Sequence, residues 1–229
     1  MKFRVLLLMF LSIAATAQIK EDKSSIYFDV FAGIPVGKYH TMLKETNANR
    51  SNFGFALGYL VSPYKGKKPS KVFYGAEMSY QANGSDAIVS YISGTYRAVF
   101  STFALNGVVR YRPIWWASKI NPFFDAYCGP KIYGQKIIEY ISEQETSKVW
   151  SLPRTMLNYG IGAGTGFQLH TPSGKGIYLD VGIYYQQADP RKIIKRNSIG
   201  IDGDGNVNYQ QIMSSTNQWK IKAGITGFH

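Results

Sequence analysis

The chain has 229 residues, of which 45% are hydrophobic and 15% aromatic, whereas only 17% are charged. Ordinary soluble domains carry roughly 25% charged residues, so this composition favours one domain with a large apolar surface. A formal net charge of +12 would suit a nucleic-acid partner, but the export signal described next argues against nucleic acid. The single cysteine, Cys128, excludes an intramolecular disulfide and a cysteine-based zinc site.

Residues 1–17 carry the features of a secretory signal peptide. Basic Lys2 and Arg4 precede an apolar stretch at 5–13, and Ala15-Thr16-Ala17 forms a small-residue cleavage site before Gln18. The apolar stretch is too short for a permanent membrane helix, and no cysteine follows the site to carry a lipid anchor. We predict that residues 1–17 are removed and that residues 18–229 form one exported domain.

Later segments lack the roughly 20 consecutive apolar residues of a membrane-spanning helix, so any membrane span must come from strands. Eight segments have strand character and about the 9 to 11 residues that a tilted strand needs to cross a bilayer. They are residues 26–34, 52–61, 72–81, 102–112, 122–133, 157–169, 176–187 and 218–228. An even number allows an antiparallel sheet to close with both termini on one side.

The clearest of these segments is 157–169, with the sequence LNYGIGAGTGFQL. Its odd positions are apolar or neutral, and its even positions are polar or glycine, which is the period of a strand. We expect the apolar side to meet lipid and the glycines to make room in a crowded barrel lumen. A phosphate-binding glycine loop is the alternative, but it needs a turn that leads into a helix.

The connections between the strands alternate in length. Longer ones follow the first, third, fifth and seventh strands, at 35–51, 82–101, 134–156 and 188–217. Shorter ones lie at 62–71, 113–121 and 170–175. Outer-membrane barrels have short periplasmic turns and long external loops, so both termini are expected in the periplasm. We expect the long connections to be irregular loops that hold any recognition site.

Placing the apolar side of each strand outward directs nearly all the charge inward. A Lys or Arg in contact with lipid near the midplane costs roughly 2 to 4 kcal/mol, so this choice of face is strongly favoured. The predicted inward residues are four acids and four bases: Asp29, Glu77, Asp125, Asp180, Arg110, Arg112, Lys220 and Lys222. We expect a salt-bridged plug, with a charged catalytic pocket as the alternative interpretation of the same residues.

Aromatic residues fall near the strand ends, where rings with one polar atom suit the membrane interfaces. They are Tyr59, Tyr74, Tyr80, Tyr111, Trp115, Trp116, Tyr185 and Trp219. A stacking surface for sugar or nucleic acid uses the same residue types, but their scatter over many strands favours two girdles.

Four pattern-level features belong together: the signal ending Ala-Thr-Ala-Gln, the opening strand with DVFAGIPVG, the glycine alternation at 158–166 and the closing KIKAGITGF. In these features the chain resembles, over residues 26–228, the small outer-membrane barrels common in Bacteroidota, including the PorT-like barrels associated with type IX secretion. One departure is that the chain ends Phe228-His229, whereas such barrels usually end on an aromatic residue, and the alternation puts Phe228 inward.

Candidate catalytic and metal-binding residues are few. The histidines, His40, His170 and His229, are scattered, so a metal site is not expected. His40 shares the external side with Ser85 and Asp86, and lipid A acyltransferases carry a His and an Asp-Ser pair in comparable loops. Here the order is Ser-Asp and no surrounding motif matches, so we predict no catalytic residues.

Two further motifs lie in the last long connection. Residues 202–206 (DGDGN) look like the start of a calcium loop, but Val207 and Met213 stand where that pattern needs glycine and a carboxylate. A glycine-assisted turn is the preferred interpretation, and no cofactor or metal is predicted.

The same connection begins with a basic cluster, Arg191, Lys192, Lys195 and Arg196. We expect these side chains to face outward, either to bind anionic surface glycolipid or as a solvated charge run. A second basic group, Lys65, Lys67, Lys68 and Lys71, lies on the periplasmic side, where inner-leaflet lipid or a protein partner could be met.

Together these patterns predict an all-β fold, an eight-stranded antiparallel up-and-down transmembrane barrel, located in the cell outer membrane. We expect a monomer without enzymatic activity and with a structural, surface-interaction or secretion-accessory role. A lipid-modifying enzyme of the acyltransferase or deacylase type is the alternative, followed by a small-solute channel.

Overall fold

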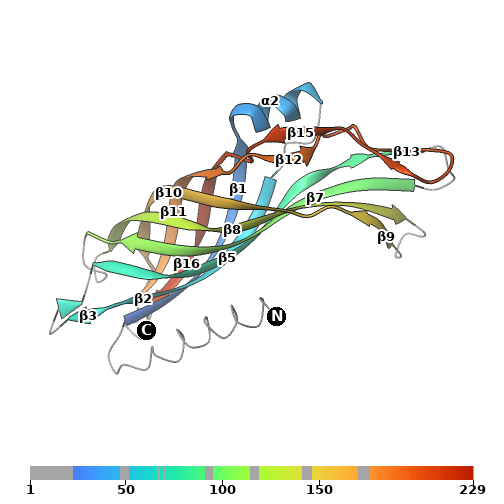
Figure 1. Cartoon of the computed structure of the whole chain (residues 1–229). Helices are drawn as coiled ribbons and strands as arrows, with labels where there is room; N and C mark the ends of the chain where they lie inside the picture. The colour runs from blue at the N-terminus through green and yellow to red at the C-terminus, as the bar shows by residue number, and fades with distance from the viewer. Residues whose placement is uncertain are drawn as a thin grey trace, which may run out of the picture.

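The computed structural model describes residues 23–46, 52–65, 68–69, 71–90, 95–113, 119–140, 146–169 and 176–228. Within these ranges, eight long strands form a closed antiparallel barrel (Figure 1). They are β1 (Lys23–Pro35), β2 (Asn52–Ser62), β5 (Val72–Ala87), β7 (Thr95–Tyr111), β8 (Ile120–Tyr140), β10 (Arg154–Gln168), β11 (Ile177–Ala188) and β16 (Gln218–Phe228). Each strand pairs with the next along the chain, and β16 pairs with β1, so the ring is complete. The predicted eight-stranded barrel and all eight predicted strands are confirmed.

The first and last strands, β1 and β16, close the barrel, and Ser25 of β1 pairs with Phe228 of β16. Every second residue of each strand points inward, and side-chain burial follows this alternation. The register shifts once between β5 and β7, between Ala82 and Ser85. Gly84 lies in this bulge with a φ of +85°, a backbone conformation that glycine adopts without strain.

The predicted loop boundaries are wrong on the side of the long connections, because β5, β7 and β8 continue well past their predicted ends. These connections also contain regular elements in place of the expected irregular loops. They are α2 (Gly37–Glu45), β6 (Val89–Ser90), β9 (Thr146–Ser151), β12 (Arg191–Ile194), β13 (Gly200–Ile201), β14 (Val207–Asn208) and β15 (Gln211–Ser214). We call this set, with the adjoining ends of β7, β8 and β10, the cap.

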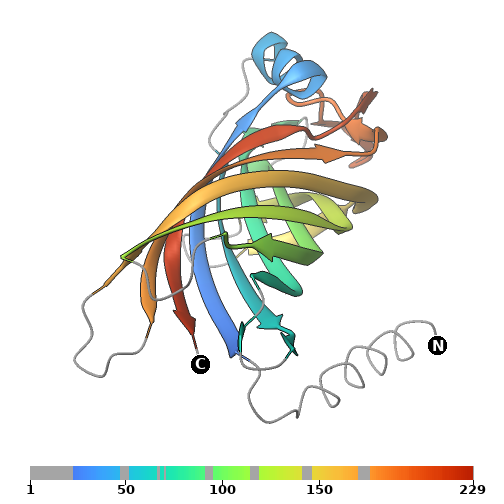
Figure 2. The ribbon, with the colours of Figure 1, turned by 90° about the vertical axis from the view of Figure 1, so that its left-hand side faces the viewer.

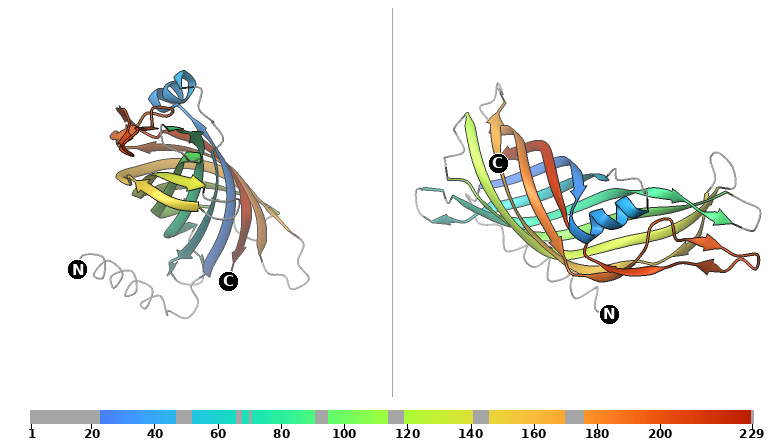
Figure 3. Two further views of the ribbon diagram at one scale, coloured as in Figure 1. Left: turned by 90° about the vertical axis from the view of Figure 1, so that its right-hand side faces the viewer. Right: turned by 90° about the horizontal axis from the view of Figure 1, so that it is seen from above.

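The cap lies at one end of the barrel, and the short hairpin of β3 (Tyr64–Lys65) and β4 (Lys68–Pro69) lies at the other (Figures 1 and 2). The start of β1 and the end of β16 are at the hairpin end (Figure 2). Views from the side and from above show α2 and the β12–β15 segment over the same end of the barrel (Figure 3). The cap end is therefore the side of the long connections.

The outer wall of the barrel is apolar. Large hydrophobic side chains on all eight strands are exposed, and Ile161 reaches 67% exposure. A soluble protein rarely leaves so large an apolar surface in water, so this band is the lipid-facing surface of a membrane barrel. Among the described helices, none is long and apolar enough to cross a membrane.

Glycines on β10 make room for the filling of the lumen, as the sequence pattern predicts. A Cβ built on Gly162 would meet the ring of Tyr184, and one built on Gly164 would meet Phe123. On the opposite wall, Gly58 lies in the same way under the ring of Tyr27. A bulky aromatic from one strand therefore packs over a glycine on its neighbour.

Candidate functional site: the lumen and the cap

The lumen of the hairpin half is filled by a network of ion pairs. Arg110 on β7 binds Asp125 on β8 through two hydrogen bonds of 2.8 Å, and Asp125 also accepts a bond from the Tyr184 hydroxyl. Asp180 on β11 accepts from Arg110 at 3.2 Å and from Arg112 at 2.9 Å. All of these side chains are buried. Buried charges are tolerated when they are paired and hydrogen-bonded in this way, and here the paired side chains fill this part of the lumen.

A second ion-pair layer lies closer to the cap. Lys222 on β16 binds Glu77 at 2.6 Å and lies 3.7 Å from Asp29. The hydroxyl of Tyr27 donates to the same oxygen of Glu77 at 3.0 Å. All eight charged residues predicted to face inward are therefore buried in the lumen. Phe228 is also inward, packed against Phe73 and Tyr178.

The predicted balance of four acids and four bases is wrong in one respect, because Lys131 on β8 is also in the lumen and only 1% exposed. Its ammonium group donates to the carbonyl oxygen of Thr216 at 3.3 Å. The ion pairs of the described residues include neither Lys131 nor Lys220. Lys220 lies over the ring of Phe31, 4.4 Å from its centre.

Amide side chains form the next layer and reach across the lumen. Gln81 on β5 and Gln218 on β16 exchange hydrogen bonds of 2.8 and 2.9 Å, and Gln218 donates to Gln186 on β11. Gln186 donates in turn to Asn158 on β10, which donates to Asn106 on β7. This chain of amides links five strands in the part of the barrel that leads to the cap. Their alternating donors and acceptors leave the layer well satisfied.

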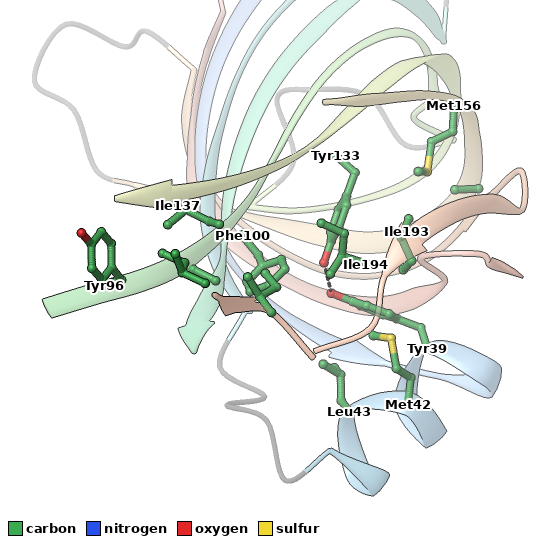
Figure 4. Packing of buried hydrophobic residues seen from close by; sticks show 14 residues of the cluster. Tyr39, Met42, Leu43, Tyr96, Phe100, Tyr133, Ile137, Met156, Ile193 and Ile194 are labelled. Atoms are coloured by element: carbon green, nitrogen blue, oxygen red, sulfur yellow. Dashed lines mark hydrogen bonds between the residues drawn. The ribbon is translucent and has the colours of Figure 1, made fainter. Parts of the chain in front are cut away.

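The cap closes over this layer with a hydrophobic cluster (Figure 4). Helix α2 contributes Tyr39, Met42 and Leu43, whose spacing places them on one helix face. The barrel ends and β12 contribute the remaining labelled residues: Tyr96, Phe100, Tyr133, Ile137, Met156, Ile193 and Ile194. Burial raises the pKa of the Tyr39 hydroxyl, which lies 3.4 Å from that of Tyr133. The cap is thus a packed core of its own, on top of the lumen.

A buried ion pair fastens the cap to the barrel. Both oxygens of Asp86 on β5 accept from the guanidinium of Arg196, at 2.5 and 2.7 Å. Arg196 has 0% side-chain exposure and also donates to the carbonyl oxygen of Asn83 at 2.9 Å. Its guanidinium lies 4.1 Å from the centre of the Phe100 ring. The prediction that Arg196 faces outward with its basic neighbours is therefore wrong.

This ion pair also weakens the catalytic hypothesis for His40, Ser85 and Asp86. Ser85 and Asp86 belong to β5 and His40 to α2, so they are not on loops. The carboxylate of Asp86 is occupied by Arg196 and by the backbone N–H of Asn197 at 3.0 Å. A catalytic acid needs a free oxygen directed at its histidine, and Asp86 has other partners on both oxygens.

The calcium-like motif forms a turn. Asp202 Oδ1 accepts from the backbone N–H groups of Asp204 and Asn206, at 3.0 and 2.8 Å. These hydrogen bonds, led by the one from Asn206, lower the pKa of the Asp202 carboxyl. The other oxygen accepts from the side chains of Asn206 and Asn208. The turn interpretation is confirmed, and no group of three metal-ligating side chains occurs in the described parts of the chain.

Most aromatic residues predicted for the girdles lie on the outer wall. Tyr59, Tyr74 and Tyr111 are exposed toward the hairpin end, and Tyr80 and Trp219 toward the cap. Tyr185 packs on Trp219 with ring centres 4.9 Å apart. Several predicted residues lie outside the described residues or side chains: Trp115, Trp116, His170, His229, Lys65, Lys67 and Lys68. The predicted signal at 1–17 also lies outside the described residues.

Comparisons with known proteins identify the type of fold. No protein-family model and no curated protein sequence matches the chain. The structure does match solved barrels, among them a major outer membrane protein from Thermus thermophilus. That protein is 12% identical, the match covers 92% of this chain and 100% of the other, and the TM-score is 0.50. The fold is that of an outer-membrane β-barrel. This fold confirms the predicted location in the cell outer membrane.

Two further solved structures are similar at lower TM-scores. Ail of Yersinia pestis is 14% identical with a TM-score of 0.45, over 91% of this chain and 99% of the other. Neisserial surface protein A is 12% identical with a TM-score of 0.43, over 90% and 96% of the two chains. The closer resemblance to PorT-like barrels of Bacteroidota stays a prediction.

Proposed function

We propose that the protein is a non-catalytic, monomeric outer-membrane barrel whose ordered cap binds a partner at the cell surface while the lumen stays closed. The observation that carries this proposal is the packed cap, which is fastened by the Asp86–Arg196 ion pair. A rigid surface binds a partner with less loss of conformational entropy than a mobile loop does. A hydrophobic core packed across one end of the barrel argues against a solute channel, because it lies in the path of the solute.

Photo-crosslinking from two exposed lysine positions tests this proposal. Lys44 is exposed on α2 in the cap, and Lys71 is exposed next to the β3–β4 hairpin at the other end. A photoreactive residue at position 44 in living cells should give an adduct with a surface component, and the same residue at position 71 serves as the matched control. Adducts from position 71 alone would contradict a surface role.

The resemblance to PorT-like barrels supports a secretion-accessory role as the second form of the proposal. That role places the partner at the periplasmic end, so it predicts adducts from position 71 and loss of secreted cargo on deletion of the gene. The two roles are distinguished by the position from which the adduct forms.

The enzyme alternative is tested at His40. Because Asp86 is occupied by Arg196, His40→Ala should leave the mass spectrum of the surface lipids unchanged. A mass shift of one acyl chain between the variant and the wild type would contradict the non-catalytic proposal.

A further inference from the structure

Lys220 is a buried cation of the lumen whose ammonium group has no counter-ion. Its side chain lies over the ring of Phe31, and the described parts of the chain give its ammonium group neither a hydrogen bond nor an ion pair. The carboxylate that acts on it, Glu77, is already bound by Lys222 and by the hydroxyl of Tyr27. A buried charge is tolerated only when it is paired, so Lys220 needs an anion that these side chains do not supply.

The charge of the lumen below the cap points to the same need. Four buried carboxylates face five buried cations, because Lys131 joins the four cations expected from the sequence. Lys131 donates to a backbone carbonyl oxygen, forms none of the ion pairs of the described residues, and adds to the positive charge around Lys220. One bound monovalent anion would make this part of the lumen neutral.

Asn52 lies close to Lys220 on the inner face of the wall. Lys220 of β16 pairs with Gly33 of β1, and Gly33 pairs in turn with Asn52 of β2. Neighbouring strands lie roughly 5 Å apart, so Lys220 and Asn52 stand about 10 Å apart on either side of a residue without a side chain. Asn52 is buried, and neither its amide nitrogen nor its amide oxygen has a hydrogen-bond partner. A buried amide is rarely left unsatisfied, so Asn52 marks a place where a ligand is missing.

The amide of Gln81 lies over the same glycine. A Cβ built on Gly33 would meet Gln81 Nε2 and Gln218 Oε1. The same Cβ would lie 3.3 Å from the Cβ of Asn52, so the two amide side chains are neighbours. Gln81 uses one amide hydrogen in its 2.9 Å bond to Gln218, and an amide nitrogen carries two. Around Gly33 there are therefore an ammonium group and two side-chain amides with hydrogens to donate, and no free carboxylate.

We propose that this part of the lumen binds one small inorganic anion of halide size, held by the ammonium group of Lys220 and the side-chain amides of Asn52 and Gln81. The Gln81–Gln218 pair lies on the cap side of the site and the Lys222–Glu77 ion pair on the other side, so a bulky organic anion is excluded.

The position of this site gives the anion a role in holding the cap. Gly33 lies near the end of β1, just before α2, and Asn52 is the first residue of β2, just after it. The anion thus joins the two strand ends between which α2 is inserted. The site lies inside the barrel, so it does not depend on which partner the cap binds.

Urea unfolding of the full mature chain in phosphatidylcholine vesicles tests the site. Chloride replaces gluconate, a bulky organic anion, at constant ionic strength. If the folded protein holds one chloride that unfolding releases, the unfolding equilibrium constant should fall about tenfold for each tenfold rise in chloride above the dissociation constant. Lys220→Met should abolish this dependence. Lys44→Met removes an exposed cation of α2 and should keep it.

Asn52→Asp tests the same site by supplying a carboxylate of nearly the same shape as the amide. This variant should be more stable than the wild type in gluconate, and its stability should not depend on chloride, because the carboxylate takes the place of the anion beside Lys220. A wild type without chloride dependence, or a dependence that persists in Lys220→Met or is lost in Lys44→Met, would overturn the proposal. An Asn52→Asp variant less stable than the wild type in gluconate would also overturn it, because the new carboxylate would then lack a cation.

Discussion

At the scale of single residues, the interior of this barrel depends on paired charges and on glycines that accommodate aromatic rings. Arg110, Asp125 and Asp180 form hydrogen-bonded ion pairs in the lumen. Arg196 forms a similar buried ion pair with Asp86 beneath the cap. Each of these groups is stable in the interior only because its partner is present. Single substitutions should therefore have large effects at these positions and small effects at exposed ones.

Asp86→Ala should lower the free energy of unfolding by about 3 to 5 kcal/mol, because it leaves the guanidinium of Arg196 buried without a carboxylate. The measurement is urea unfolding of the refolded chain in lipid vesicles. Asp204→Ala is the matched control on the exposed turn and should change stability by less than about 0.5 kcal/mol. The double variant Asp86→Ala/Arg196→Met should recover much of the lost stability. An Asp86→Ala variant as stable as the wild type would contradict a buried ion pair.

Gly162→Ala should destabilise the barrel by about 1 to 3 kcal/mol, because the added Cβ meets the ring of Tyr184. Gly107→Ala is the control on another strand of the barrel, where the nearest atom is the Cys128 carbonyl oxygen at 3.7 Å. The same unfolding measurement applies. Equal stability of the two variants would mean that Tyr184 does not pack over Gly162.

At the scale of the elements, strand alternation made the barrel predictable. The period of two on 157–169 and the apolar faces of the other strands identified all eight strands and the inward side of each. Lys131 was missed although it lies six residues from Asp125 on β8, so the same alternation places both side chains inward. The cap was not predictable in the same way, because α2 and β12 are short and gain their stability from contacts such as Tyr39 with Tyr133, far apart in the sequence.

Cys128 offers a direct check of the orientation of β8. It is exposed on the outer wall, opposite Tyr159 of β10. In lipid vesicles it should resist a charged, water-soluble maleimide, because lipid excludes the reagent and keeps the thiol protonated, and it should react after unfolding in urea. Rapid labelling by the charged reagent in the folded protein, at the rate seen in urea, would place Cys128 in water and contradict the assigned face.

At the scale of the whole molecule, the two ends of the barrel differ in kind. The hairpin end has short connections, and the cap end has an ordered layer with its own core. This asymmetry predicts the orientation in the membrane. A short epitope inserted after Gly203, in the exposed turn, should be accessible to antibody on intact cells, and one at Lys67 should be accessible only after the outer membrane is permeabilised. Accessibility at Lys67 on intact cells would reverse the orientation.

Electrical recording of the purified protein in planar bilayers tests whether the ion pairs, the amide layer and the cap close the lumen. An eight-stranded barrel has an interior just wide enough for side chains to fill, and here those side chains are hydrogen-bonded across the lumen. We expect no stable conductance from the wild-type protein, with a known open porin in the same bilayers as the positive control. Steady single-channel currents from the wild-type protein would contradict it.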